Sequence, residues 1–362
     1  MADDYKYHID HHGSLVRPAA LQVARASGDA AVLAATEQEA VVAAAHVLRR
    51  LALSAVSDGQ FRRDYFEAVV HEHVDGFGPA SGPAPLGDAA GIPEARRRAT
   101  SDSLHAIGRL AADEPPTLLA TVDRPVFVQL PSPGYLAAVS SALASSADID
   151  SVRARGAALA EIIRAEIEAL SADGVSYVAL ENPLYPPLLT VAGRAQLAAA
   201  GVDVDAVLAA LLEADRAAVS GLTDHETFRV GLDLTDSGPL PTTSQGYDGS
   251  AVDVLLDANP FHRLGIDFPA APAARFPLER IKPGLVISLG VVDVSQPSLE
   301  PVDDILDRID PVYEKRTEDD IAVATNGGFA QSADTQLMTE EEQTAKLRLV
   351  ETVARYYWGN EL

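Results

Sequence analysis

The chain contains no cysteine among its 362 residues, which excludes disulfides, a catalytic thiol and any thiolate ligand for a metal. Lysine is also scarce, at 4 residues against 24 arginines. Acidic residues outnumber basic ones by 53 to 28, and the formal net charge is −25. No basic stripe is available to neutralise phosphates, so the charge excludes nucleic acid as a partner. We expect the acidic excess to keep the protein soluble.

Long hydrophobic runs are absent as well. No stretch approaches the roughly 18 uninterrupted apolar residues of a transmembrane helix, so we expect no membrane partner. The first twelve residues are polar and acidic and do not resemble a signal peptide, which favours a cytoplasmic location. The glycine-rich loops that bind dinucleotides or nucleoside triphosphates do not occur, and neither does the serine elbow of hydrolases.

Short apolar runs alternate along the chain with longer alanine-rich helical stretches. Runs that are apolar at consecutive positions are typical of strands covered on both faces. Eight strand–helix alternations predict an α/β fold, a closed (β/α)8 TIM barrel that forms one domain over residues 1–362. The expected strands are residues 7–11, 55–58, 126–130, 175–180, 228–234, 252–256, 285–289 and 321–325.

Two stretches rich in proline, glycine and polar residues interrupt this alternation. Residues 76–93 follow the second expected strand and residues 236–250 follow the fifth. In a barrel of this kind the loops after the strands cover the active site. Both stretches are therefore candidate lids, or else mobile surface insertions.

Polar side chains follow most of the expected strands, although the strands themselves are apolar. Because the carboxyl ends of barrel strands meet at one mouth, this contrast indicates an enzyme or small-ligand site. The alternative is that strand ends are polar only because loops meet water. The residues concerned are His11, His12, Ser14, Arg17, Asp58, Gln60, Arg62, Arg63, Glu181, Asn182, Asp233, Asp236, Asp257, Asp293, Ser295 and Asn326.

Two N-terminal motifs carry a family resemblance. Residues 11–18 (HHGSLVRP) and 57–63 (SDGQFRR) resemble the start of the catalytic barrel of cobalamin-independent methionine synthase and its shorter relatives. The resemblance extends from residue 11 to about residue 358 and implies a barrel of the methionine synthase type. In that family, a zinc ion held by His, Cys, Glu and Cys activates a thiol for methylation.

The resemblance implies how a substrate would be held. Ser14 stands in the His-x-Gly-Ser turn, where it would meet a substrate carboxylate. Gln60 stands where the family has a glutamate that contacts the amino group of homocysteine, and the amide removes that charge. Glu181 and Asn182 stand where the family has Asp-Glu, so one carboxylate is kept. We therefore expect homocysteine to bind poorly, and a carboxylate without an ammonium to bind better.

The zinc ligands of the family have no counterparts in the sequence. The His-x-Cys pair aligns best with residues 231–233, the glutamate with Asp257, and the last cysteine with residues 325–329. A histidine of the family is replaced within residues 291–295. Zinc sites of this kind need N and S ligands, so zinc is not expected. Asp233 and Asp257, joined by Asp236, leave open a harder, oxygen-coordinated metal such as magnesium.

The first hypothesis is a methionine-synthase-like transferase or lyase that acts on a small anionic substrate without zinc-thiolate chemistry. Its expected catalytic residues are Asp58, Glu181, Asp233 and Asp257. Its expected substrate-binding residues are His11, Ser14, Arg17, Gln60, Arg62, Asn182, Ser295 and Asn326. The second hypothesis is a folate-dependent methyltransferase with an acceptor other than homocysteine, and the third is a non-catalytic binding barrel. No cofactor is predicted, and folate is left open. Assembly into a homo-oligomer is also left open.

Overall fold

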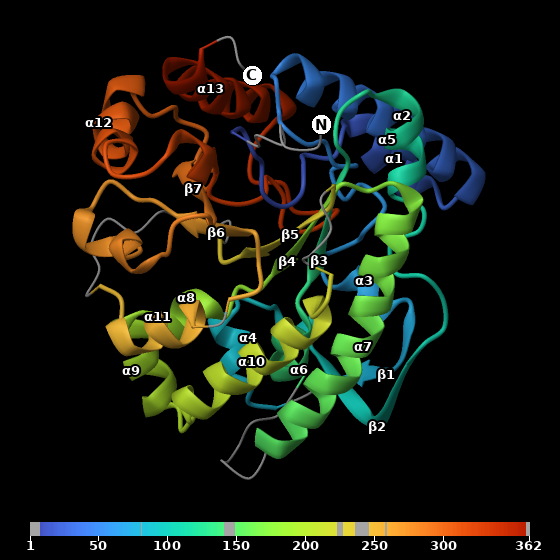
Figure 1. The fold of residues 1–362 in the computed structure, drawn as a ribbon. Helices are drawn as coiled ribbons and strands as arrows, with labels where there is room; N and C mark the ends of the chain where they lie inside the picture. Colours follow the sequence, from blue (N-terminus) through green and yellow to red (C-terminus); the bar gives the residue numbers. More distant parts are fainter. Residues whose placement is uncertain are drawn as a thin grey trace.

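The computed structural model describes residues 8–80, 82–140, 149–222, 227–235, 246–257 and 259–359. Six parallel strands form its central sheet, and each strand pairs with the next one along the chain (Figure 1). This order is the one expected when every connection crosses over in the same hand. The strands are β3 Phe127–Pro131, β4 Tyr177–Glu181, β5 Arg229–Asp233, β6 Arg263–Asp267, β7 Val286–Val292 and β8 Ile321–Thr325.

Two short segments connect the edges of this sheet. Ile9 forms a parallel bridge to Val323 of β8, and Val56 forms one to Val126, next to β3. The amide of Ser54 donates to the carbonyl of Ile9 over 2.9 Å, so the two segments also touch each other. The sheet therefore closes into a barrel, and the predicted α/β class is confirmed. The first two expected strands are reduced to single bridges, and residue 7 lies outside the described residues.

The sixth expected strand is wrong. Residues 252–256 lie in helix α11 (Gly249–Leu256), whose first turn is capped by the side chain of Asp248. The sixth strand is β6, seven residues beyond the end of α11. A short apolar run fits a buried helix as well as a buried strand, and here the capping aspartate decides the outcome.

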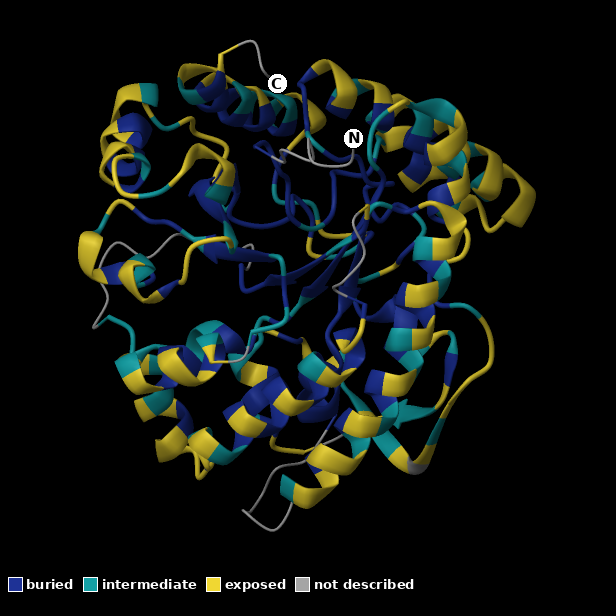
Figure 2. Ribbon diagram, in the orientation of Figure 1, coloured by how far each residue is buried: buried dark blue, intermediate teal, exposed yellow. Residues whose placement is uncertain are grey.

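Helices surround the barrel, and the long ones among them expose their outer faces (Figure 2). The alanine-rich stretches of the sequence form helices, and residues 191–219 divide into α9 and α10 at a turn containing Gly201. The helices are α1 Ala19–Ser27, α2 Ala30–Arg50, α3 Ala68–His71, α4 Pro85–Ala89, α5 Pro115–Thr121, α6 Pro133–Val139, α7 Ile149–Asp173, α8 Tyr185–Leu189, α9 Val191–Ala199, α10 Val204–Val219, α11, α12 Val302–Tyr313 and α13 Glu340–Trp358.

Among the described helices, α2 is long and apolar enough to cross a membrane by length and composition alone. It also meets the requirements of a surface helix of a barrel. Asp29 caps its first turn, and Ala40, Val41, Ala45 and Leu48 are buried while the rest of its length is largely exposed. The expected cytoplasmic location stays a prediction.

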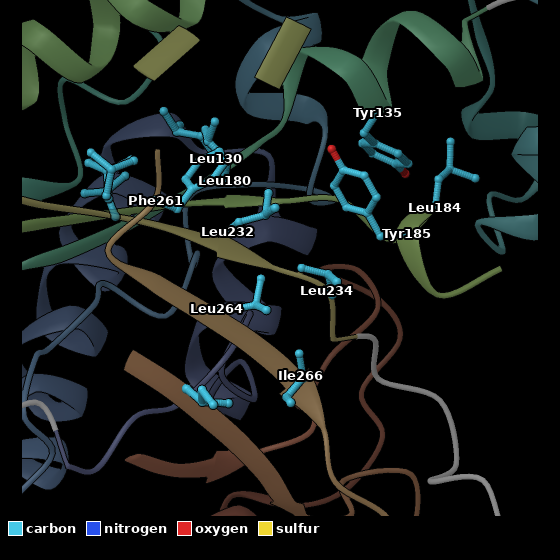
Figure 3. Packing of buried hydrophobic residues seen from close by; sticks show 14 of the residues in the cluster. Leu130, Tyr135, Leu180, Leu184, Tyr185, Leu232, Leu234, Phe261, Leu264 and Ile266 are labelled. Carbon is cyan, nitrogen blue, oxygen red and sulfur yellow. The ribbon is translucent and has the colours of Figure 1, made fainter. Parts of the chain in front are cut away.

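The core has two parts because strand side chains alternate between the two faces of the sheet. Leu130, Leu180, Leu232 and Leu264 point outward, into a large cluster shared with the helices (Figure 3). Inside the barrel, the apolar cluster consists only of Ala55, Phe127, Tyr177 and Ala179. Much of the remaining interior is polar, which is unusual for a barrel, where branched apolar residues normally fill the centre.

The expected loop at residues 76–93 is partly regular. It begins in strand β1 (Val74–Pro79), which pairs antiparallel with β2 (Arg98–Ala106), and it contains α4. This hairpin lies outside the barrel and brings residues 88–92 over the mouth. Most of the second expected loop, including Asp236, lies outside the described residues.

Candidate functional site at the barrel mouth

A cavity of about 360 Å³ lies at the carboxyl ends of the strands. Segments that are far apart in the sequence contribute to its wall, as expected at a barrel mouth. Of the residues predicted from the sequence, Ser14, Arg17, Gln60 and Glu181 line it. The other principal wall residues are Gly13, Tyr65, Glu67, Asp88, Ile92, Arg96, Tyr135, Thr235, Gly327, Gly328 and Gln331.

Two glycines allow the first and last strand ends to meet at this mouth. Gly13 has φ of +66°, and a Cβ atom there would lie 2.8 Å from the backbone of Gly328. A Cβ on Gly328 would lie 2.4 Å from the amide nitrogen of Ser14. Any side chain would therefore separate the two loops. The Ser14 hydroxyl donates to the carbonyl of Ala330 over 2.6 Å, which fixes the same contact.

Beneath the cavity, His12 and Asp233 form a buried ion pair. The His12 Nδ1 lies 2.5 Å from Asp233 Oδ2, and its Nε2 lies 3.2 Å from the Ser288 hydroxyl. That hydroxyl donates to Asp10 over 2.7 Å, so it accepts from His12, and both ring nitrogens carry protons. Burial lowers the pKa of His12, but the charge and hydrogen bond of Asp233, together with the charge of Asp10, more than offset it and the net shift is upward. The pKa of Asp233 is correspondingly lowered by His12 in spite of burial.

A second ion pair continues this polar interior away from the mouth. Asp10, which accepts from Ser288, also forms a short ion pair with the guanidinium of Arg263. Two glycines make room for these groups. A Cβ on Gly265 would lie 2.7 Å from Asp233 Oδ1, and one on Gly231 would lie 2.3 Å from the Tyr177 hydroxyl. The interior charges therefore balance in pairs.

Gln129 connects this hydrogen-bond network to the cavity wall. Its Nε2 donates to Asp233 over 3.1 Å, so its Oε1 faces the mouth. There Oε1 accepts from the Gly13 amide at 2.8 Å and from Gln60 Nε2 at 3.2 Å. A carboxylate at position 60 would face the Gln129 oxygen without a proton between them. The network thus provides a physical reason for an amide at position 60.

Arg17 is a buried cation without a carboxylate partner in the described part of the chain. Its guanidinium donates only to the carbonyls of Leu15, Gln60 and Arg63, and its Nε has no partner among the described residues. Burial lowers its pKa to about 10, and the nearby positive charge of Arg25 adds to this effect. A buried, unpaired charge is costly, so this side of the cavity is electrostatically suited to an anion.

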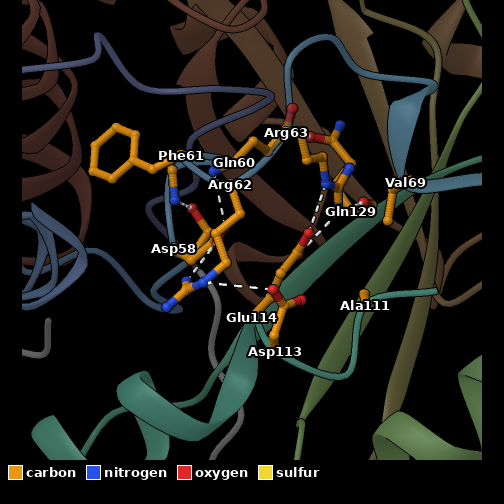
Figure 4. Close-up of polar contacts among 12 residues, drawn as sticks. Asp58, Gln60, Phe61, Arg62, Arg63, Val69, Ala111, Asp113, Glu114 and Gln129 are labelled. Atoms are coloured by element: carbon orange, nitrogen blue, oxygen red, sulfur yellow. Dashed lines mark hydrogen bonds and ion pairs between the residues drawn. The ribbon is translucent and has the colours of Figure 1, made fainter. Parts of the chain in front are cut away.

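The neighbouring arginines, in contrast, are paired (Figure 4). Arg63 binds both carboxylate oxygens of Glu114, at 2.6 and 2.9 Å, and not Glu67, which lies one helical turn away in sequence. Arg62 lies 3.6 Å from Asp58 and 3.6 Å from Asp113. Neither Asp58 nor Arg62 lines the cavity. They hold together the segment that follows the bridge at Val56, and burial raises the pKa of Asp58.

Three carboxylates line the cavity, Glu67, Asp88 and Glu181, and Asp88 is paired with Arg97. Glu67 accepts a 2.5 Å hydrogen bond from the hydroxyl of Tyr135, whose pKa burial raises well above its usual value. Glu181 is the last residue of β4 and is half-buried. Glu181 stands at the carboxyl end of its strand, where its side chain reaches the cavity wall, and the Glu67 carboxylate is held by the Tyr135 hydroxyl.

Several other residues predicted from the sequence lie away from the cavity. Both ends of the Asn182 amide are used, towards Asp215 Oδ2 at 3.0 Å and the Leu184 amide at 3.1 Å. Asn326 accepts from the Val294 amide, and the amide of Ser295 is held by Asp293. Asp257 is exposed at the end of α11, so its expected position after a strand is wrong.

His11 points to a different environment from His12. Its Nε2 lies 3.2 Å from the Ser57 hydroxyl, its ring meets Phe127 edge-on, and it does not line the cavity. Burial lowers the pKa of His11 to about 4, and the neighbouring charge of His12 adds to this effect. His11 is therefore neutral near pH 7.

The described residues do not fit a zinc ion. They contain no group of three or more His, Asp or Glu side chains arranged to hold a metal. Both nitrogens of His12 are bonded, Asp233 is paired with it, and Asp257 lies elsewhere. Asp257 cannot join Asp233 in an oxygen-coordinated site, and Asp236, the other expected ligand, lies outside the described residues. The absence of zinc stays a prediction for metal analysis.

Some wall residues were missed by the sequence analysis. Glu67, Arg96 and Tyr135 lie well beyond any expected strand end. Gln129, which does not line the cavity but accepts from the wall residues Gly13 and Gln60, lies inside a strand. A search restricted to strand ends could not find them. The alternation of β3 was a usable signal, because Gln129 is polar within an apolar run and must face the barrel interior.

No protein-family model matches the chain. Two relatives from Bacillus subtilis (strain 168) match over nearly full length: YxjH is 25% identical and YxjG 23%, each covering 97% of this chain and 95% of the relative. Both are uncharacterized proteins.

Solved structures identify the fold. A B12-independent methionine synthase from Shewanella sp. W3-18-1, in complex with selenomethionine, superposes with a TM-score of 0.75 at 16% identity and covers 97% of both chains. A candidate vitamin B12-independent methionine synthase from Listeria monocytogenes gives 0.64 at 19% identity, with 98% of both chains covered. The chain has the fold of these methionine synthases. The resemblance of residues 11–18 and 57–63 is thus confirmed at the level of the fold.

Proposed function

We propose that the protein is a group-transfer enzyme that works without a metal and binds a small anionic substrate in the mouth cavity. The observation that supports this most directly is Arg17, a buried guanidinium on the cavity wall with no carboxylate partner among the described residues. An anion in the cavity would offset the charge of Arg17. Elsewhere in the interior, His12 and Arg263 already have acidic partners.

The anionic end of the substrate is assigned to the side of the cavity formed by Arg17, Arg96 and Gln60. The Arg96 guanidinium lies 5.8 Å from the ring centroid of Tyr65 and donates to the Gln331 carbonyl over 3.0 Å, which leaves it other donors. Gln60 is neutral, so this side does not attract an ammonium group as a glutamate would. A carboxylate without an α-amino group fits it best.

Glu181 is assigned the proton transfer. When a group moves from its donor to an O–H or N–H acceptor, the bond to the donor breaks with its electron pair on the donor. The acceptor loses its proton at the same time, and a carboxylate at the cavity wall can take it. The proton resides on Glu181 until it passes to the departing donor, directly or through solvent. Lyase chemistry has no specific support in this arrangement. The shared fold makes methionine-like thioethers the first compounds to test.

Calorimetric titration with the des-amino analogue of methionine tests this assignment. We expect the analogue to bind more tightly than methionine itself. Arg96→Gln should weaken its binding roughly tenfold, the effect of one charge-assisted hydrogen bond. Arg124→Gln is the matched control, because Arg124 is also half-buried but does not line the cavity. Equal losses in both variants, or tighter binding of methionine, would count against the proposal.

Metal analysis of protein purified without chelator tests the other half of the proposal. We expect less than stoichiometric zinc, because His12 and Asp233 bind each other. One tightly bound zinc per chain would require that pair to open and would contradict a reaction without a metal.

A further inference from the structure

The barrel lacks a regular helix between β6 and β7. Residues 268–285 form only two short 3₁₀ turns, Pro272–Ala274 and Leu278–Arg280. This segment faces the neighbouring helix α12 on the outer flank of the barrel (Figure 1). A cavity of about 760 Å³ remains between them, separate from the barrel mouth.

Four cations line this flank cavity: Arg275, Arg308, Lys315 and Arg316. The three guanidiniums donate to backbone carbonyls, and none has a carboxylate within ion-pair distance in the described part of the chain. Such a cluster is unexpected in a protein with 53 acidic and 28 basic residues. Two acidic side chains, Glu279 and Asp320, also lie on the wall but do not pair with these arginines.

Burial makes these charges costly. It lowers the pKa of Arg275, Arg308 and Arg316, the reverse of what a paired arginine shows. Arg308 uses three of its donors on the carbonyls of Asp304, Phe268 and Val291. A guanidinium has five N–H donors, so some remain for a ligand.

The rest of the wall is apolar. Phe268, Phe276, Ile281 and Val312 contribute to it, and the Arg275 guanidinium lies 4.9 Å from the ring centroid of Phe268. Arginine stacked on an aromatic ring next to an apolar surface suits a ligand that is flat, apolar and negatively charged at one end.

We propose that the flank cavity is a second ligand site, which binds an organic anion with a flat apolar body. The anionic group lies among the guanidiniums and the apolar body lies against Phe268 and Phe276. This site does not depend on the function proposed for the mouth.

Two fluorescent probes of nearly the same shape test the proposal. Anilinonaphthalene sulfonate carries the anion, and N-phenylnaphthylamine lacks it. We expect the sulfonate to bind the folded wild-type protein at least tenfold more tightly than the neutral probe. Equal binding of the two probes, or no binding of the sulfonate, would overturn the proposal.

Charge reversals then locate the site. Arg275→Glu should weaken sulfonate binding roughly tenfold or more, and Lys315→Glu several-fold, with little effect on the neutral probe. The Lys315 side chain is exposed and forms no hydrogen bond or ion pair with another described residue, so its variant remains informative if Arg275→Glu fails to fold. Lys282→Glu is the control, because Lys282 is exposed and lies outside the cavity wall. A loss in Lys282→Glu as large as that in Lys315→Glu would place the probe elsewhere and contradict the assignment.

Discussion

The cationic side chains of the barrel interior differ from those on the walls of the two cavities in their hydrogen-bond partners. In the interior, His12, Arg63 and Arg263 each bind a buried carboxylate. On the cavity walls, the arginines donate to backbone carbonyls and have no carboxylate partner in the described ranges; they are Arg17, Arg275, Arg308 and Arg316. In a protein with so many acidic residues, buried arginines without carboxylate partners are unexpected. We therefore propose that the cations left without them mark the places where an anion binds.

This difference has an energetic consequence. Removing one partner of a buried ion pair leaves an uncompensated charge, which costs about 3–5 kcal/mol. Changing a guanidinium that serves a ligand should instead alter binding more than stability. The interior pairs and the cavity arginines can therefore be told apart by separate measurements of folding and binding.

The largest effect is expected for Asp233→Ala. It leaves the His12 imidazolium buried without its carboxylate and frees the amide of Gln129. We expect the free energy of unfolding to fall by about 3–5 kcal/mol, measured by chemical denaturation. Asp257→Ala is the control, because that side chain is exposed at the end of α11, and it should change stability by less than about 0.5 kcal/mol. Similar losses of stability in the two variants would show that the His12–Asp233 pair contributes no more than an exposed side chain.

The second effect concerns His11, which is buried without an acidic partner. Its pKa is lowered from 6.5 to about 4, so the unfolded chain takes up a proton first as the pH falls. The stabilisation is present above pH 6.5 and is lost between 6.5 and about 4. Over this range, the stability of the wild type relative to His11→Gln should fall by about 3 kcal/mol. Exposed His46→Gln provides the baseline. A difference that stays constant with pH would refute this interpretation.

The smallest effect is expected for Gln60→Glu. The new carboxylate would face Gln129 Oε1, which is held in place by Asp233. We expect a loss of about 1–3 kcal/mol in the free energy of unfolding, the cost of a buried polar group without a partner. Gln60→Met removes the amide without adding charge and should cost less. If Gln60→Glu is as stable as the wild type, then Gln129 must be able to turn over.

The sequence indicated most of the barrel, and the place where it misled is informative. Strands 127–131, 177–181 and 321–325 are mostly apolar and were found within a residue or two. β6 was missed because its inward positions carry Arg263 and Gly265. Arg263 binds Asp10, and Gly265 makes room for Asp233 and His12. A strand adapted to the polar interior loses the apolar pattern by which strands are recognised.

The site was partly predictable for a related reason. Ser14, Arg17, Gln60 and Glu181 follow strands directly, and the barrel rule brings them to the mouth. Asp58, Asp233 and Asn182 follow strands too, but other side chains occupy them. Sequence position shows which residues reach the mouth region. Only the contacts show which of them still have donors or acceptors to offer a ligand.

One binding comparison tests the central claim most directly, namely that unpaired guanidiniums mark the mouth as an anion site. Thermal unfolding of the wild-type protein is measured with small carboxylates of methionine-like size and, in parallel, with their methyl esters. Because a ligand that binds the folded state raises the melting temperature, we expect members of the acid series to stabilise the protein and their esters to have little effect. Esters that stabilise as well as the acids, or no stabilisation by any acid, would contradict the account.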